Sequence, residues 1–179
     1  MLPFIPGQIY DRRRDIHDVY GGNWQSGIAP SKEHPYIFIF TGKSGHQHGY
    51  EDGWDNKYVF SYTGEGQDGN MDFLRGNLAL RDHVAKGKRV FLFEFEMKGY
   101  VKFVDELQLF DYDYFESHDT QKRQRTAIKF FMQPVNRSPG PKRPTMNVST
   151  STTVFSFHPP TTPSSIDTSS LLTSAVTSC

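Results

Sequence analysis

The sequence predicts an α+β, mainly β fold: a strongly curved sheet or small β-barrel with two flanking helices, followed by a disordered C-terminal tail. Aromatic residues make up 15% of the 179 residues, whereas all hydrophobic residues reach only 36%. The core must therefore be built largely from Phe and Tyr. Short apolar and alternating segments recur along residues 1–135, and the composition changes sharply near Pro134.

Five or more strands account for most of residues 1–135. Residues 36–40 read Tyr-Ile-Phe-Ile-Phe, apolar on both faces as in a central strand that is covered on each side. Residues 89–97 alternate, and residues 100–104 follow Gly99 as a hairpin partner. The other expected strands are residues 58–63, 107–114 and 126–132, and the expected helices are residues 13–19 and 71–85.

Two regions are predicted, a folded domain over residues 1–135 and a tail over residues 136–179. About half of the residues after Pro144 are Ser or Thr, and Asp167 is the only Asp, Glu, Lys or Arg among them. Such a segment cannot bury enough apolar surface to offset its ordering entropy, so we expect disorder.

Charge and composition exclude several classes of function. Residues 1–135 hold 17 Lys/Arg and 19 Asp/Glu, so any contact with nucleic acid must come from local patches. Cys179 is the single cysteine, which excludes a disulfide framework. No apolar run approaches the roughly 18 residues needed to span a bilayer, and the N-terminus does not resemble a signal peptide. We expect an intracellular protein with no membrane partner.

The segment from Gly49 to Gln67 holds the most specific chemistry. Tyr50 and Tyr62 could stack on the two faces of a flat ring, each contributing about 1–3 kcal/mol. Asp52 or Asp55 could accept from a cytosine amine, while Thr63 and the backbone of residues 64–66 meet the other polar edge. A flipped nucleobase fits this set best. The alternative is a glycine-rich hairpin in which the tyrosines only pack.

The order Gly-Tyr-Glu-Asp, a second aspartate, then Phe-x-Tyr-Thr-Gly-x-Gly resembles the signature of the SRA (SET- and RING-associated, or YDG) domain. Residues 7–28 and the Gly-Asn-Leu-Ala-Leu run at 76–80 resemble other segments of that family. The form Tyr-Thr-Gly-Glu-Gly-Gln is similar to the SRA-like module of McrA-type HNH restriction endonucleases. The resemblance covers about residues 5–133.

The resemblance implies a PUA-like β-barrel that binds double-stranded DNA by flipping a modified cytosine, 5-methylcytosine or a related base. It implies a pocket with Tyr50 and Tyr62 as walls and Thr63 as lining. Asp52 is our choice for the residue that reads the cytosine edge, although the family position falls on Gly53. Further candidates for pocket or groove contacts are Trp54, Asp55, Gly64, Glu65, His17 and Tyr20.

Basic residues supply candidates for phosphate contacts: Arg12, Arg13, Arg14, Lys88 and Arg123. The alternative for each is an ordinary solvated charge, and neighbouring aspartates compete for Arg12 to Arg14. His46 and His48 could share a strand face, but no third ligand with suitable spacing is evident, so we expect no metal site and no cofactor.

Phosphodiester hydrolysis requires catalytic machinery that this chain does not show. The McrA-type enzymes carry a C-terminal HNH module, whereas the tail here has only His158 and no His-Asn-His arrangement. We therefore expect a chain that binds DNA without cutting it, in the cytoplasm at the nucleoid if bacterial or in the nucleus if eukaryotic. The alternatives are a truncated HNH endonuclease, a reader of modified RNA and a protein-interaction module. Oligomeric state is left open.

Overall fold

The computed structural model describes residues 2–42 and 52–136. The chain divides into two units, Met1–Arg143 and Pro144–Cys179, and all described residues belong to the first. The tail beyond residue 136 therefore lies outside the described residues, and its disorder stays a prediction.

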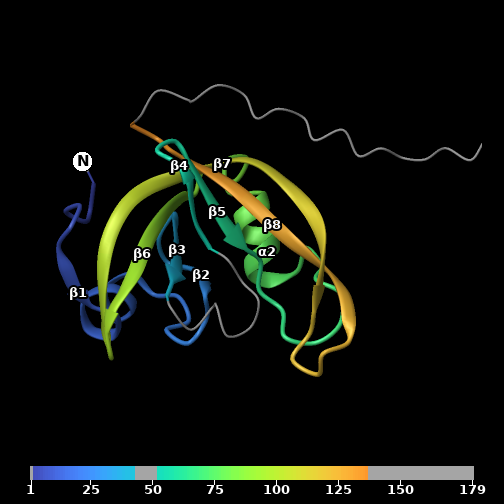
Figure 1. The fold of residues 1–179 in the computed structure, drawn as a ribbon. Helices are drawn as coiled ribbons and strands as arrows, with labels where there is room; N and C mark the ends of the chain where they lie inside the picture. The colour runs from blue at the N-terminus through green and yellow to red at the C-terminus, as the bar shows by residue number, and fades with distance from the viewer. Residues whose placement is uncertain (1, 43–51, 137–179) are drawn as a thin grey trace, which may run out of the picture. The chain divides into compact units, whose positions relative to one another are not determined.

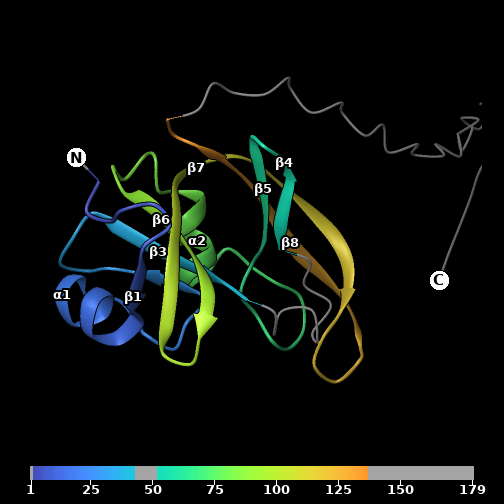
Figure 2. The same ribbon diagram turned by 60° about the vertical axis from the view of Figure 1, so that its left-hand side comes forward.

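A single mixed sheet dominates the described residues and curves strongly, as Figures 1 and 2 show. Its strands pair in the order β2-β3-β6-β7-β8-β5-β4, with β1 added to β7. The pairing of β3 with β6 is parallel and the others are antiparallel. The mainly β prediction is confirmed. The strand bounds are β1 Ile9–Asp11, β2 Ile28–Pro30, β3 Tyr36–Thr41, β4 Gly53–Asn56, β5 Val59–Thr63, β6 Arg89–Met97, β7 Tyr100–His118 and β8 Gln124–Pro134.

The strands predicted separately at residues 100–104 and 107–114 are one continuous strand, β7. Two acidic residues, Asp105 and Glu106, interrupt the apolar alternation there. In the structure both are buried and satisfied: Asp105 accepts a hydrogen bond from the Glu106 N–H at 2.9 Å, and Glu106 pairs with Arg89 through two bonds of 2.7 and 2.8 Å. The strand can therefore pass through this point without a turn.

The first predicted helix exists as two short pieces, a π-helix η1 (Arg12–His17) and α1 (Asp18–Tyr20). The second, α2, covers only Arg75–Arg81 and is much shorter than the predicted range of 71–85. Its expected first turn is instead attached to β8, because the Met71 N–H donates to the Thr126 carbonyl at 2.9 Å. That bond to the sheet replaces a helical one.

Two hydrophobic clusters lie on opposite faces of β3, as the apolar pattern of this strand predicted. Ile37 and Ile39 face the cluster inside the curve of the sheet, where α2 lies (Figure 1), while Phe38 faces the second cluster beneath η1. Phe4 is the centre of the second cluster, with four ring neighbours edge-on at 5.0–5.4 Å. Phe and Tyr do build much of the core, as the composition required.

Candidate modified-base site

Tyr62, the predicted pocket wall, lies near the end of β5 and belongs to the inner cluster, with 4% of its surface exposed. Its hydroxyl donates to the Phe40 carbonyl at 3.3 Å. A Cβ on Gly27 would lie 3.1 Å from the same hydroxyl oxygen, so a side chain there would crowd the ring. Burial, followed by the charges of Asp52 and Glu65, raises the pKa of Tyr62 well above its ordinary value. The phenol therefore stays neutral.

Asp52 and Thr63 meet beside Tyr62. Asp52 Oδ1 accepts a hydrogen bond from the Thr63 N–H at 2.7 Å. Burial raises the pKa of Asp52, and hydrogen bonding from Thr63 opposes this rise. The Thr63 hydroxyl is buried and lies near the carboxylate, yet no hydrogen bond of good geometry reaches it from the described residues. The two residues thus hold polar atoms with unused hydrogen-bonding capacity.

The backbone that follows Thr63 is fixed to α2 by Asn77. The side-chain oxygen of Asn77 accepts from the Glu65 N–H at 2.8 Å, and its amide donates to the carbonyls of Glu65 at 2.8 Å and Asp72 at 3.0 Å. Glu65 Oε1 in turn accepts from the Gly76 N–H at 2.9 Å, and burial raises the pKa of its carboxyl. Gly64 and Glu65 are therefore held rigidly next to the candidate pocket.

Arg12 lies beside Phe40, the residue whose carbonyl accepts from Tyr62. Its guanidinium lies over the Phe40 ring, 3.7 Å from the ring centroid, and donates to the Ser26 carbonyl at 2.7 Å. Burial lowers the pKa of Arg12. His17, five residues later, is 7% exposed and lies 5.5 Å from the Phe40 ring between centroids. Both side chains of η1 therefore turn inward.

The remaining predicted contacts are spread over the domain. Tyr20 packs edge-on against Phe4 at 5.4 Å, Trp54 against Phe60 at 5.2 Å, and Asp55 accepts from the Ser61 hydroxyl at 2.6 Å. Four basic residues complete the set. Arg13 is exposed over Trp24, Arg14 pairs with Asp15, Lys88 donates to the Ser31 carbonyl, and Arg123 pairs with Asp119.

Tyr50, His46 and His48 lie outside the described residues. The opposing wall that Tyr50 would form is therefore still a prediction. The phosphate roles of the basic residues also stay predictions. Within residues 2–42 and 52–136, no group of three or more His, Cys, Asp or Glu side chains could hold a metal ion.

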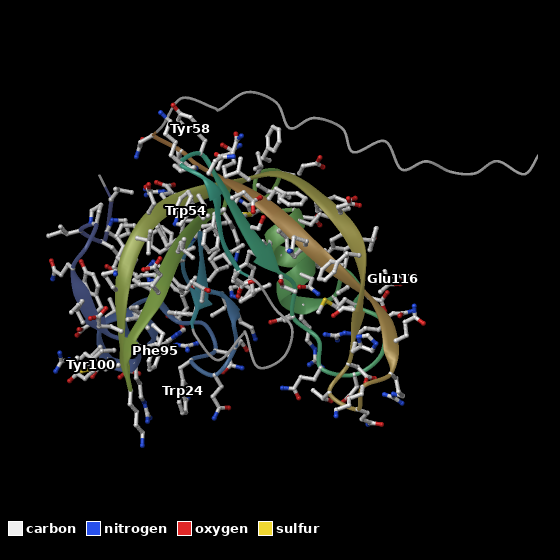
Figure 3. All side chains as sticks on the ribbon, viewed as in Figure 1. Trp24, Trp54, Tyr58, Phe95, Tyr100 and Glu116 are labelled. Atoms are coloured by element: carbon white, nitrogen blue, oxygen red, sulfur yellow. The ribbon has the colours of Figure 1, made fainter. Side chains whose placement is uncertain are left out.

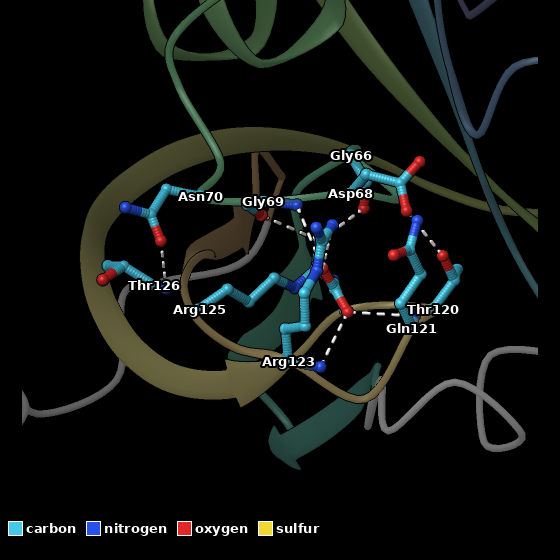
Figure 4. A network of polar contacts seen from close by, with 10 residues as sticks. Gly66, Asp68, Gly69, Asn70, Thr120, Gln121, Arg123, Arg125 and Thr126 are labelled. Carbon is cyan, nitrogen blue, oxygen red and sulfur yellow. Dashed lines mark hydrogen bonds and ion pairs between the residues drawn. The ribbon is translucent and has the colours of Figure 1, made fainter.

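The segment after the pocket, residues 66–70, is bound by the tip of the β7–β8 hairpin (Figure 4). Arg125 donates to the Gly66 carbonyl at 2.8 Å, and Asp119 accepts from the Arg123 side chain at 2.7 Å. Desolvation alone would raise the pKa of Asp119, but hydrogen bonds from Arg123, Gly69 and Gln121 outweigh it and lower the pKa to about 2. No sequence pattern predicted this network, because its two halves lie 50 to 59 residues apart.

An exposed aromatic surface lines a groove of about 730 Å³ next to Arg12. Trp24, Phe95 and Tyr100 gather at the end of the sheet that carries the β6–β7 turn, far from Trp54 and Tyr58 (Figure 3). Phe95 is 55% exposed and Trp24 48% exposed. The sequence placed Phe95 and Tyr100 only in the expected strands at residues 89–97 and 100–104 and did not predict that they share a groove.

Comparison with known protein families identifies the family of this chain. The model of the family described as "ScoMcrA-like, SRA domain" matches residues 6–152, which is most of the chain. The chain belongs to the ScoMcrA-like SRA domain family. The resemblance drawn from the Tyr-Thr-Gly-Glu-Gly-Gln segment is thereby confirmed.

Solved structures agree on the fold of this SRA domain. It is similar to a structure of the sulfur-binding and SRA domains of ScoMcrA with phosphorothioated DNA (TM-score 0.58, 23% identity, 78% of this chain and 41% of that chain). It is also similar to the structure of the Type IV phosphorothioation-dependent restriction endonuclease ScoMcrA (TM-score 0.59, 20% identity, 78% of this chain and 29% of that chain). A third similar structure is the SRA domain of SUVH5 with hemimethylated CG DNA (TM-score 0.54, 24% identity, 76% of this chain and 91% of that chain).

The chain thus spans less than half of either ScoMcrA chain. No curated protein matches it. No helix in the described part of the chain has the length and apolar character needed to cross a membrane.

Proposed function

We propose that this SRA domain binds double-stranded DNA containing a modified cytosine, with the base extruded into a site at Tyr62. The convergence of Asp52, Tyr62 and Thr63 carries the proposal: a half-buried carboxylate lies beside a buried aromatic ring and a buried hydroxyl that has no well-aligned partner among the described residues. A carboxylate is the side chain that accepts from the cytosine amine. The solved relatives with methylated and phosphorothioated DNA support modified DNA as the ligand class.

Stacking on Tyr62 requires a conformational change. The ring is 4% exposed, so the parts of the chain that cover it must move when a base enters. Extruding a base from a duplex itself costs a few kcal/mol, and stacking and edge hydrogen bonds offset that cost. We therefore expect binding to be selective for bases that use both the aromatic face and the polar edge.

Cleavage of DNA is assigned in this proposal to a separate HNH nuclease module or subunit, as the McrA-type resemblance implies. This domain would then act where DNA is, at the nucleoid of a bacterial cell or in the nucleus of a eukaryotic one.

The test is a binding titration of the purified chain with four matched duplexes: unmodified, 5-methylcytosine, 5-hydroxymethylcytosine and phosphorothioate. We expect tighter binding to at least one cytosine-modified duplex than to the unmodified one. Equal affinity for all four would overturn the proposal, and preference for the phosphorothioate alone would replace the base by the backbone as the recognised group.

Asp52→Asn tests the site itself. The variant keeps an oxygen for the Thr63 N–H but loses the carboxylate that accepts from the amine, so we expect the preference for modified DNA to fall about 10- to 100-fold, the equivalent of about 1–3 kcal/mol. Asp55→Asn is the matched control, because Asp55 lies three residues away, bonded to Ser61. If both variants behave alike, Asp52 does not read the base.

A further inference from the structure

Arg12 is an unusual residue in its surroundings. Its side chain is half-buried against Phe40, with Nε fully buried, and no carboxylate among the described residues forms an ion pair with it. A buried cation without a charged partner is costly. The bond to the Ser26 carbonyl and the contact with the Phe40 ring offset only part of that cost. The Nε–H of Arg12 is buried and has no hydrogen-bond partner among the residues described.

A second unfilled polar atom lies beside it. His17 Nδ1 is 3.1 Å from the Gly21 carbonyl, but the buried Nε2 has no partner within the described ranges. The π-helical turn brings Arg12 and His17 to the same ring, Phe40, although they are five residues apart. π-helical turns are rare and occur frequently at functional sites. Buried polar atoms without partners require an explanation, and a ligand that is not present is one.

The position of Arg12 connects this cluster to Tyr62. Tyr62 donates to the carbonyl of Phe40, the residue over whose ring the guanidinium lies, and Arg12 is near enough for its charge to lower the pKa of the phenol. Asp52 also interacts with Tyr62 electrostatically. The solvent side of Arg12 reaches the groove of about 730 Å³ that Trp24 and Tyr100 line. A cation and a carboxylate therefore both lie near one aromatic ring.

We propose that Arg12 is a specificity-determining residue of the base site, donating to the acceptor edge (N3 and O2) of the extruded cytosine, while Asp52 accepts from its amine. This inference depends on the proposed function. Cytosine presents one donor and two acceptors along its Watson–Crick edge, which is the edge that proteins read in a flipped base. A carboxylate and a guanidinium together complement that edge, whereas a phosphate contact would not need a guanidinium turned toward the inside of the domain.

The test compares Arg12→Lys with Arg13→Gln in titrations of modified and unmodified duplexes at several salt concentrations. Lys keeps the positive charge and the packing stem but lacks the Nε–H. We expect Arg12→Lys to lose about tenfold or more of the preference for modified DNA with an unchanged salt slope. Arg13→Gln removes an exposed charge that lies over Trp24. This variant should instead bind both duplexes equally more weakly, with a salt slope reduced by about 1.

Arg12→Lys with wild-type preference would overturn the inference, as would equal weakening on both duplexes with a smaller salt slope, the behaviour of a phosphate contact. Wild-type protein that does not discriminate would overturn the proposed function itself. If Arg12→Lys fails to fold, the NMR signal of the Arg12 Nε–H in wild-type protein decides. It should shift with modified DNA and stay unchanged with unmodified DNA, and an identical response to both would refute the role.

Discussion

Replacing Asn77 by Ala should destabilise the domain more than any comparable polar substitution on its surface. Asn77 is 2% exposed and uses both ends of its amide: one bond to the Glu65 N–H, one to the Glu65 carbonyl and one to the Asp72 carbonyl, all between 2.8 and 3.0 Å. Asn77→Ala removes all three hydrogen bonds at once, while the Glu65 N–H and the carbonyls of Glu65 and Asp72 stay in place without that partner.

The magnitude follows from that count. A buried backbone group left without its partner costs about 1–3 kcal/mol, so three of them in the lower part of that range predict a loss of about 3–5 kcal/mol. This is a large fraction of the stability of an ordinary domain, which is about 5–15 kcal/mol. At about 3–4 °C per kcal/mol for a domain of this size, the unfolding midpoint should fall by about 9–20 °C.

Urea denaturation and thermal unfolding of the two proteins measure the effect directly. Asn23→Ala is the matched control, because Asn23 is exposed and makes a single bond of 3.0 Å with the Gln25 N–H. It should change stability by about 0.5 kcal/mol or less. A loss below about 1 kcal/mol for Asn77→Ala, or equal losses for both variants, would refute the assignment of Asn77 as the residue that fixes the backbone at Glu65.

Three further predictions concern charge and pH. Burial lowers the pKa of His83, whose ring nitrogens contact the Lys88 carbonyl at 2.8 Å and the Leu109 N–H at 3.0 Å. Its stabilising contribution should be complete above the unfolded pKa of about 6.5 and lost as the pH falls, so the stability difference between wild type and His83→Ala should shrink from pH 7.5 to pH 5. Burial raises the pKa of Asp52, so the folded state holds its proton more tightly, and the stability of wild type relative to Asp52→Asn should fall as the pH rises from 4 to 7.5; a constant difference would contradict the assigned shift. Glu106→Gln should lower the free energy of unfolding in urea by about 1–3 kcal/mol, because the Glu106 side chain is only 9% exposed and pairs with Arg89. Arg14→Gln removes an exposed pair with Asp15 and should leave stability unchanged.

The sequence by itself predicted the class of fold and the family. Alternating and doubly apolar segments are local signals, and they located β3, β5, β6 and β8 to within a few residues. The motif from Gly49 to Gln67 is also local, and it indicated the family that the comparison later confirmed. Local patterns predict well where the cause lies within a few residues of the effect.

The tertiary structure alone decided which polar residues meet. Whether Arg12 faces phosphate or the interior depends on the turn of η1 against Phe40, which no charge pattern contains. The bonds of Asn77 to Glu65 and of Arg125 to Gly66 join residues 12 and 59 positions apart. Such contacts depend on the register and curvature of the sheet, which bring distant segments together only after the chain has folded, and for that physical reason the environment of the base site could not be predicted from the sequence.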